Sequence, residues 1–232
     1  MILPTFNERE ALELFYPTLA PVVERLGGEV VVVDDGSPDG TAEFARALDG
    51  PVRCTVIERP GVRGLASAVL AGIARAQGSV LAVMDADGSH PPSVLPDLVA
   101  AVTTGGTELA LGSRWVNGGH APGLTRVRWA ESTLARCIAR PLTDVRDPMS
   151  GFFAVRREVL GRARLTPVGY KIALEILVKC RPRPYVEIPF VFERRLAGES
   201  KLGRRVIGNY LVHLARLYAS EVTAGRRASS TR

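Results

Sequence analysis

Two pairs of carboxylates stand where apolar runs of the sequence end. Asp34 and Asp35 follow four valines, and Asp85 and Asp87 follow the run SVLAVM. Carboxylates brought close together repel one another, which raises their pKa unless a cation neutralises them. A divalent ion that prefers oxygen ligands, Mg²⁺ or Mn²⁺, is the natural partner of the second pair. Such an ion keeps coordination positions open for phosphate oxygens.

Each pair also has a purely structural explanation. A lone D-x-D occurs often by chance; Asp85 would then cap the next helix, and Asp87 would simply be exposed. A site is favoured because both pairs end apolar strands. In the stretch DDGSPDGT we interpret Asp34 and Asp35 as ligand contacts. Turn and capping roles are predicted for Ser37, Asp39 and Thr41.

Apolar runs and helical periods alternate along the first half of the chain. Strands are predicted at residues 29–35, 52–58, 79–87 and 108–114, and helices at 40–49, 64–77 and 91–105. Strands that are apolar throughout are buried on both faces, which predicts a doubly wound α/β fold with a mostly parallel sheet. Ligands bind outside the carboxyl ends of such strands, where both carboxylate pairs lie. Only three residues precede Pro4, so a central first strand there would be very short. The possibility that the chain lacks its natural start therefore remains open.

The second half of the chain has a different rhythm. A Gly-rich loop at 115–125 precedes a helix at 125–142, a loop, strand and helix start at 147–160, a helix at 169–180, a strand at 185–195 and a polar linker at 196–205. Residues 206–222 are predicted to form an amphipathic helix. Its apolar face comprises Ile207, Tyr210, Leu211, Leu214, Leu217 and Tyr218. His213 and Arg216 are placed elsewhere on this helix, and the tail at 223–232 is predicted to be disordered.

The charge of the chain is concentrated near its end. The 232 residues carry a net charge of +6, and residues 181–232 alone carry 11 Lys and Arg against 4 Asp and Glu. Such a block suits nucleic acid, an anionic membrane or a phosphorylated substrate. The three scattered cysteines form neither a zinc pattern nor a disulfide framework, which favours a reducing compartment. We see no secretory signal and no apolar run long enough to cross a bilayer.

Seven motifs follow one another along the chain: LPTFNE, VVVDDGSPDGT, MDADGSHPP, GSRWVNGG, DPMSGFFAVRR, GYKIALEILVK and FERRLAGESKLG. In this order they resemble the polyprenol-phosphate (dolichol-phosphate) mannose synthases, family-2 glycosyltransferases with the Rossmann-like GT-A fold. The resemblance covers residue 2 to about residue 203. It divides the chain into a catalytic domain, 1–203, and an amphipathic helix with a basic disordered tail, 204–232.

The resemblance implies a metal-dependent, inverting enzyme that moves mannose from GDP-mannose to a polyprenyl monophosphate. It assigns the nucleotide sugar to Pro4, Phe6, Glu8, Val33, Asp34, Asp35, Asp85, Ala86 and Asp87. Phe6 replaces a more common tyrosine and keeps a ring that can pack against a base. Mg²⁺ or Mn²⁺ would be held by Asp85, Asp87 and Ser89. A serine reaches less far than the glutamine of some members, so the contact of Ser89 with the metal is either direct or through water.

A lipid phosphate is already anionic, so it needs no general base to act as the nucleophile. It needs cations that hold it near the anomeric carbon. The acceptor-binding candidates are Arg114, Arg126, Arg195 and Lys201. The catalytic set is Asp87 with Arg114, Arg195 and Lys201. Each arginine is a solvated surface charge in the alternative reading, and the nearby Arg128 can substitute for Arg126.

Several alternatives stay open at this level. The same chemistry could use UDP-glucose or another nucleotide sugar, and a non-catalytic nucleotide-sugar-binding subunit is a rival. A nucleic-acid partner is not expected, because no recognised motif is present. The chain is expected on the cytoplasmic face of a membrane, either as a peripheral protein or through a separate membrane subunit. Lys171 and Glu175 are four residues apart, which predicts either a plain helical ion pair or a place near the site.

Overall fold

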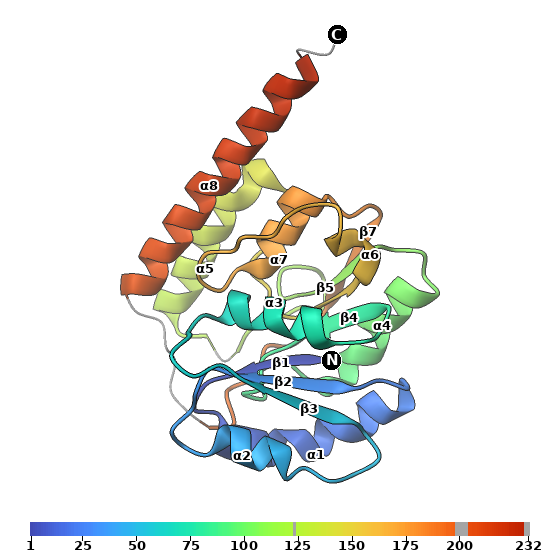
Figure 1. Ribbon diagram of the computed structural model, residues 1–232. Coiled ribbons are helices and arrows are strands. Elements are labelled where there is room, and N and C mark those ends of the chain that lie inside the picture. The colour runs from blue at the N-terminus through green and yellow to red at the C-terminus, as the bar shows by residue number, and fades with distance from the viewer. Residues whose placement is uncertain (123, 198–203, 230–232) are drawn as a thin grey trace.

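The computed structural model describes residues 1–122, 124–197 and 204–229, and Figure 1 traces them. For Arg126, for residues 204–206 and for residues 222–229 the description covers the backbone alone. Within these residues, no helix combines the length and the apolar character needed to cross a membrane.

One seven-stranded sheet forms the centre of the molecule, in the order β3-β2-β1-β4-β6-β5-β7. Its strands are β1 Ile2–Thr5, β2 Val30–Asp34, β3 Cys54–Glu58, β4 Val80–Val83, β5 Leu109–Ser113, β6 Phe153–Arg156 and β7 Tyr185–Pro189. β6 is antiparallel to its neighbours β4 and β5, and the other pairs are parallel. The other strands therefore end at the edge where β6 begins.

Helices cover both faces of this sheet. One face packs against α1 Arg9–Arg25, α2 Thr41–Arg46 and α4 Leu95–Thr103, and the other against α3 Leu65–Arg75, α6 Arg157–Leu160 and α7 Ile172–Glu175. Successive valines of β2 alternate between the faces: Val30 and Val32 lie in the first core cluster, and Val31 and Val33 in the second. The predicted doubly wound, mostly parallel fold is confirmed.

Two further helices pack at one side of the sheet. α5 Arg126–Ala139 runs beside α8 Arg204–Ser229, and α8 extends well beyond the rest of the molecule (Figure 1). Their contact with η3, a π-helical turn at Ile176–Cys180 that continues α7, forms a third core cluster around Leu174, Val178, Tyr210, Leu214 and Leu217. The Tyr210 hydroxyl donates to the carbonyl of Ala135 at 2.7 Å, and short 3₁₀ turns occupy Pro92–Val94 and Arg140–Leu142.

The first strand is indeed central and only four residues long, and all four pair in register with β2. Helix α1 is absent from the sequence prediction. Its two prolines, Pro17 and Pro21, interrupt a helical pattern that is otherwise apolar on one face.

The predicted face of the C-terminal helix is wrong at His213. This side chain is buried beside Glu175, with 3.4 Å between Nε2 and Oε2. Ile207 and Leu211, assigned to the apolar face, are about half exposed instead. The helix also continues through residues 223–229, for which the sequence predicted disorder. The proposed division of the chain at residue 203 stays a prediction.

Candidate active site

The topology gathers the predicted site residues at one edge of the sheet. Phe6 and Glu8 follow β1, and the D-x-D motif follows β4. Asp34 is the last residue of β2, and Asp35 directly follows it. Arg114 and Arg195 follow β5 and β7 at the same edge, since these strands run parallel to each other. Pro4 and Val33 are register partners inside the sheet, and both are buried.

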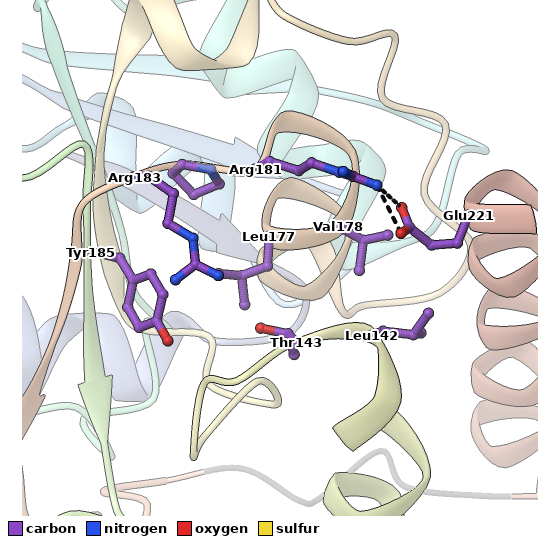
Figure 2. A pocket seen from close by; sticks show the side chains of 9 residues that line it. Leu142, Thr143, Leu177, Val178, Arg181, Arg183, Tyr185 and Glu221 are labelled. Atoms are coloured by element: carbon purple, nitrogen blue, oxygen red, sulfur yellow. Dashed lines mark hydrogen bonds and ion pairs between the residues drawn. The ribbon is translucent and has the colours of Figure 1, made fainter. Parts of the chain in front are cut away.

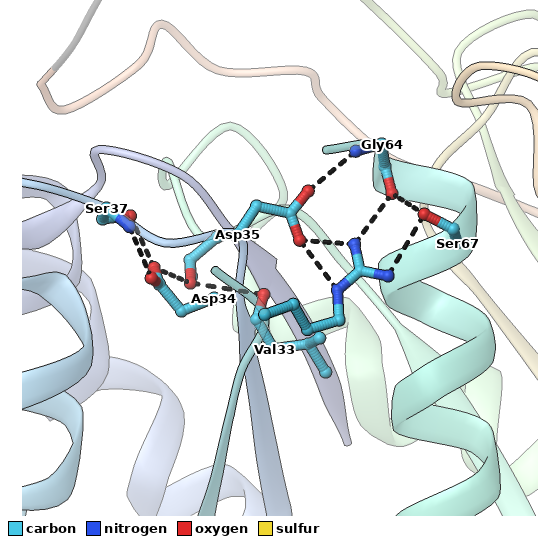
Figure 3. A network of polar contacts seen from close by, with 8 residues as sticks. Val33, Asp34, Asp35, Ser37, Gly64 and Ser67 are labelled. Atoms are coloured by element: carbon cyan, nitrogen blue, oxygen red, sulfur yellow. Dashed lines mark hydrogen bonds and ion pairs between the residues drawn. The ribbon is translucent and has the colours of Figure 1, made fainter. Parts of the chain in front are cut away.

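Asp34 is fully buried and organises the turn that follows it (Figure 3). Ser37 donates to it twice, from N to Oδ2 at 2.8 Å and from Oγ to Oδ1 at 2.5 Å. The Thr5 hydroxyl donates to Oδ1 at 2.9 Å. Asp39 in turn accepts from the backbone N and the hydroxyl of Thr41. The turn role predicted for Ser37 is confirmed, and Asp34 belongs to the same local network. Asp39 binds Thr41, the first residue of α2, but the N-cap of that helix is Gly40 and it has no side-chain capping hydrogen bond.

Asp35 faces the other way, toward the start of α3 (Figure 3). Arg59 donates to Oδ1 from Nε at 2.9 Å and also from Nη2, and the N–H of Gly64 donates to Oδ2 at 2.8 Å. Arg59 also reaches the hydroxyl of Ser67 at 3.2 Å. The sequence did not identify Arg59. Its only signal is that it directly follows the residues of β3, whose carboxyl end lies at this edge.

The ring of Phe6 is covered by a cation. The guanidinium carbon of Arg63 lies 4.1 Å from the ring centroid, a distance at which a cation and an aromatic face attract each other. Both residues belong to segments that flank Asp35 along the sheet edge. A flat, partly buried aromatic surface therefore stands beside the Asp35 network.

The two carboxylates of the D-x-D motif have different surroundings. Asp87 is buried; its Oδ1 accepts from the backbone N and the hydroxyl of Ser89, and its Oδ2 lies 3.1 Å from Nη1 of Arg195. The side chain of Asp85 is 30% exposed. Ala86 between them is buried. Ser89 thus orients Asp87, and Asp85 is the carboxylate that opens toward solvent.

The buried side chain of His90 holds the backbone of this motif in place. Its Nδ1 accepts from the N–H of Asp85 at 3.0 Å, and its ring stacks on Phe152 with centroids 5.1 Å apart. Burial lowers the pKa of His90, so the neutral ring that can accept this bond is favoured. His90 therefore has a structural role beneath the D-x-D motif.

The segment after β7 lies directly against the D-x-D motif. The N–H groups of Glu193 and Leu196 donate to the carbonyls of Ser89 and Asp87, at 3.1 and 3.0 Å. Gly88 has φ +77°, and a Cβ there would stand 2.5 Å from Cδ1 of Leu196. This contact places Arg195 over Asp87, and Nη1 also lies 4.0 Å from Oε1 of Glu8.

Arg114 is bound to Asp147, a carboxylate in the loop before β6. Its Nε and Nη2 donate to the two oxygens of Asp147, each at 2.8 Å, and its backbone N donates to Oδ2 at 3.0 Å. Burial opposes the charge of Arg114, but the hydrogen bonds that it donates to Asp147, and the negative charge of that carboxylate, prevail and raise its pKa. Asp147 is fully buried, so the pair is a neutralised unit at the edge of the site.

Of the two alternatives for Lys171 and Glu175, the helical ion pair is wrong. Lys171 precedes α7, and its Nζ donates to the carbonyl of Met149 at 2.7 Å. Glu175 pairs instead with Lys179, one helical turn further on, at 2.5 Å. Because α7 begins only at Ile172, Lys171 points away from the helix and toward the loop before β6.

Two predicted cations remain outside this geometry. Lys201 lies outside the described residues, and Arg126 is described only as the backbone start of α5. Among the described residues no group of three His, Cys, Asp or Glu side chains converges as a metal site. The oxygen donors Asp85 and Asp87 nevertheless suit a hard divalent ion whose remaining positions are filled by diphosphate oxygens and water.

A cavity of about 310 Å³ lies at the opposite end of β7 (Figure 2). Leu142, Leu177 and Val178 line it, and the Arg181–Glu221 ion pair closes one side. Tyr185, which also lines it, is the first residue of β7, whereas Arg195 follows the last. This cavity contains none of the residues that the sequence assigned to a ligand, and it is separate from the candidate active site.

Comparison with known proteins identifies the family. The model of glycosyl transferase family 2 matches residues 1–163. A dolichol-phosphate mannosyltransferase from Pyrococcus furiosus is 43% identical over 221 residues, which are 94% of this chain and 62% of the relative. The chain thus spans less than two thirds of that relative's length. A polyprenol monophosphomannose synthase from Mycolicibacterium smegmatis is 39% identical over 214 residues, 87% of this chain and 80% of the relative.

A solved structure supports the same assignment. Glucosyl-3-phosphoglycerate synthase from Mycobacterium tuberculosis, in complex with Mn²⁺, UDP-glucose and phosphoglyceric acid, has a TM-score of 0.68 at 25% identity. The match covers 92% of this chain and 78% of that chain. The GT-A fold implied by the motifs is confirmed. The chain belongs to glycosyl transferase family 2 and, within it, to the dolichol-phosphate and polyprenol-phosphate mannose synthases.

Proposed function

We propose that this protein transfers mannose from GDP-mannose to the phosphate of a polyprenyl lipid. The observation that carries the proposal is the convergence of Asp85, Asp87 and Arg195 at the carboxyl edge of the sheet, with 3.1 Å between Arg195 and Asp87. Two acidic groups and a cation at this place suit a nucleotide diphosphate bound with a metal. The names of the relatives favour mannose and a polyprenyl phosphate.

The donor would lie along the edge from Phe6 to Asp87. Its base packs against the Phe6 ring, beside Asp35, and its diphosphate lies next to the D-x-D motif. Asp85 and Asp87 would hold Mg²⁺ or Mn²⁺, which offsets the charge of the departing diphosphate. Ser89, whose hydroxyl donates to Asp87, keeps that carboxylate oriented.

The reaction needs no proton transfer. An anionic phosphate oxygen of the acceptor bonds to the anomeric carbon, and the bond from that carbon to the diphosphate breaks. GDP leaves with the electron pair, and the configuration at the carbon inverts. The work of the protein is to hold two anions close together, which requires cations at fixed positions. Arg195 and Lys201 are the candidates we retain from the sequence. Arg114 is paired with Asp147, and we assign it the role of holding the loop before β6 at the edge of the site.

A lipid acceptor requires contact with a membrane surface. α5 and α8 lie side by side, joined by hydrogen bonds from Tyr210 and Tyr218, and together they expose large apolar side chains. These are Val127, Leu134, Ile138, Ile207 and Leu211. Exposed Arg140, in the 3₁₀ turn that follows α5, and Arg216 on α8 add positive charge. We infer that this α5–α8 surface rests on an anionic bilayer, at its cytoplasmic face.

The activity is tested by transfer of radiolabelled sugar to a polyprenyl phosphate in detergent, with and without Mg²⁺ or Mn²⁺. GDP-mannose and UDP-glucose are compared, because the solved neighbour holds UDP-glucose. We expect metal-dependent label in the lipid from GDP-mannose. Label in the lipid from UDP-glucose alone would mean that the donor is UDP-glucose and not GDP-mannose. Tight nucleotide binding without transfer from either donor would favour a binding subunit.

The membrane contact is tested by sedimentation with vesicles of anionic or zwitterionic lipid. The double variant Leu134→Asp/Leu211→Asp should lose most of its binding to anionic vesicles. Leu14→Asp is the matched control, since Leu14 is 54% exposed but lies on α1. Equal loss in both variants would argue against a specific surface. Unchanged binding in the double variant would exclude this one.

A further inference from the structure

Lys171 stands where the candidate active site meets the helices of the α5–α8 surface. It follows Gly169 and Tyr170 and directly precedes α7. Its Nζ donates to the carbonyl of Met149 and lies 4.6 Å from the centroid of the Tyr170 ring. Met149 belongs to the loop that carries Asp147 and leads into β6.

The short segment before α7 touches both sides of the site. On the donor side, the carbonyl of Gly169 accepts from the N–H of Ala66 at 3.2 Å, at the beginning of α3. Two residues earlier, Gly64 donates to Asp35. On the other side, a Cβ added at Gly169 would lie 3.2 Å from Cβ of Asn209 in α8. Lys171 is therefore held between the nucleotide network and a helix of the proposed lipid-facing surface.

The charges around Lys171 leave it available for an anion. Arg114, Arg128, Asp85 and Asp147 all act on it electrostatically. The oxygens of Asp147 are taken up by Arg114, and Asp85 is partly open to solvent. Of the three N–H donors of the ammonium, the described part of the chain accepts one, through Met149.

Burial of this cation carries an energetic penalty. Burial, and then the nearby Arg114, lower the pKa of Lys171 from 10.5 to about 8. An ammonium in such surroundings gains most from an incoming anion, because the anion supplies the missing charge and hydrogen bonds.

We propose that Lys171 binds the phosphate of the acceptor directly, with its two remaining N–H donors. This inference rests on the proposed function and adds a residue to it. It also explains how the acceptor can be held although Arg114 is engaged by Asp147. A purely structural lysine would only tie Met149 in place, and its removal would disturb donor and acceptor alike.

Calorimetric binding of farnesyl phosphate, without donor or turnover, tests the proposal. Lys171→Met should weaken binding about tenfold or more, as expected for a lost charged hydrogen bond, while GDP-mannose affinity changes less than about twofold. Lys171→Arg should restore much of the loss. Arg183→Met is the control for one lost positive charge, because Arg183 is exposed at the far end of β7. Uncharged farnesol should not distinguish the variants.

The pH dependence separates a phosphate contact from a structural one. Arg114, Arg128, Asp85, Asp147 and Tyr170 face Lys171, and of these only Tyr170 loses a proton above pH 8, with a pKa that burial raises. Wild-type affinity for farnesyl phosphate should fall above pH about 8, as the ammonium loses its proton, and Lys171→Arg should not show this fall. Equal binding by wild type and Lys171→Met overturns the inference alone. Failure of the wild type to bind overturns the proposed acceptor as well.

Discussion

Arg195 and Asp87 are bound to each other across the active site, with 3.1 Å between Nη1 and Oδ2. The other carboxylate oxygen of Asp87, Oδ1, already accepts hydrogen bonds from the backbone N and the hydroxyl of Ser89. A divalent ion at Asp87 would thus compete with the guanidinium for the same carboxylate. Displaced from Asp87, Arg195 would be free to turn to a phosphate. On the proposed function, the pair would link metal binding to the availability of a cation for the reaction.

The first prediction concerns the carboxylate. Asp87→Asn keeps the shape of the side chain and its bonds to Ser89 but removes the charge that a metal requires. We expect metal-dependent GDP-mannose binding and transfer to fall by about a hundredfold or more, with little change in Tm. Asp97→Asn, on α4, serves as the control for one lost carboxylate. Full transfer by Asp87→Asn would exclude the metal assignment.

The second prediction concerns the arginine. Arg195→Met removes the competitor of the metal, so Mn²⁺ should bind more tightly in the presence of GDP while transfer decreases. Opposite signs in these two measurements are the signature of the competition. Mn²⁺ affinity can be followed by titration calorimetry, with Arg195→Lys as the variant that keeps the charge. An unchanged or weaker Mn²⁺ affinity in Arg195→Met would show that the pair does not compete with the metal.

The third prediction concerns the glycine that brings Arg195 to Asp87. Gly88 and Gly27 both have positive φ, at +77° and +60°, but only a Cβ at Gly88 meets another residue. Gly27→Ala should therefore lose about 1 kcal/mol of unfolding free energy through backbone strain alone. Gly88→Ala should lose more, by about 1–3 kcal/mol, and should also lose transfer activity, because Leu196 must move away. Urea unfolding and transfer assays compare the two variants; equal stability and full activity would contradict the prediction.

The sequence predicted the sheet better than the contacts made by its charged side chains. Apolar runs such as the four valines of β2 identify buried strands directly, and two carboxylates at strand ends indicate the edge where ligands bind. Helix α1 escaped prediction because Pro17 and Pro21 disrupt the pattern, although its other residues bury a continuous face. Local spacing is therefore informative where burial determines the residue type.

Local spacing in the sequence cannot predict contacts between residues that lie far apart in the chain. Arg59 binds Asp35 from the end of the neighbouring strand, 24 residues away, and Arg114 binds Asp147, 33 residues away. Spacing allowed an ion pair between Lys171 and Glu175, but the late start of α7 turns Lys171 toward Met149. A helical projection places His213 away from the apolar face of α8. The side chain is nevertheless buried, beside Glu175 on the neighbouring helix α7. In each case tertiary contacts decide which of several suitable partners is used.

The fourth prediction concerns this buried contact between α7 and α8. Burial opposes the charge of Glu175, but the adjacent His213, 3.4 Å away, and the hydrogen bonds from Lys179 and the N–H of Thr166 prevail and lower its pKa below the ordinary 4.5. A carboxylate with a lowered pKa stabilises the fold above its unfolded value, and this contribution is lost as the pH falls below about 4.5. Glu175→Gln should therefore be less stable at pH 7, by about 1–3 kcal/mol, since it leaves Lys179 without its charge partner.

The difference between wild type and Glu175→Gln should shrink as the pH is lowered through this range, because the wild-type carboxylate becomes protonated and neutral like the amide. Urea unfolding at pH 7, 5, 4 and 3.5 measures it. Glu158→Gln is the control, since the side chain of Glu158 is 70% exposed and should give nearly the wild-type curve. A gap between wild type and Glu175→Gln that stays constant with pH would mean that the charge of Glu175 does not stabilise the contact with α8.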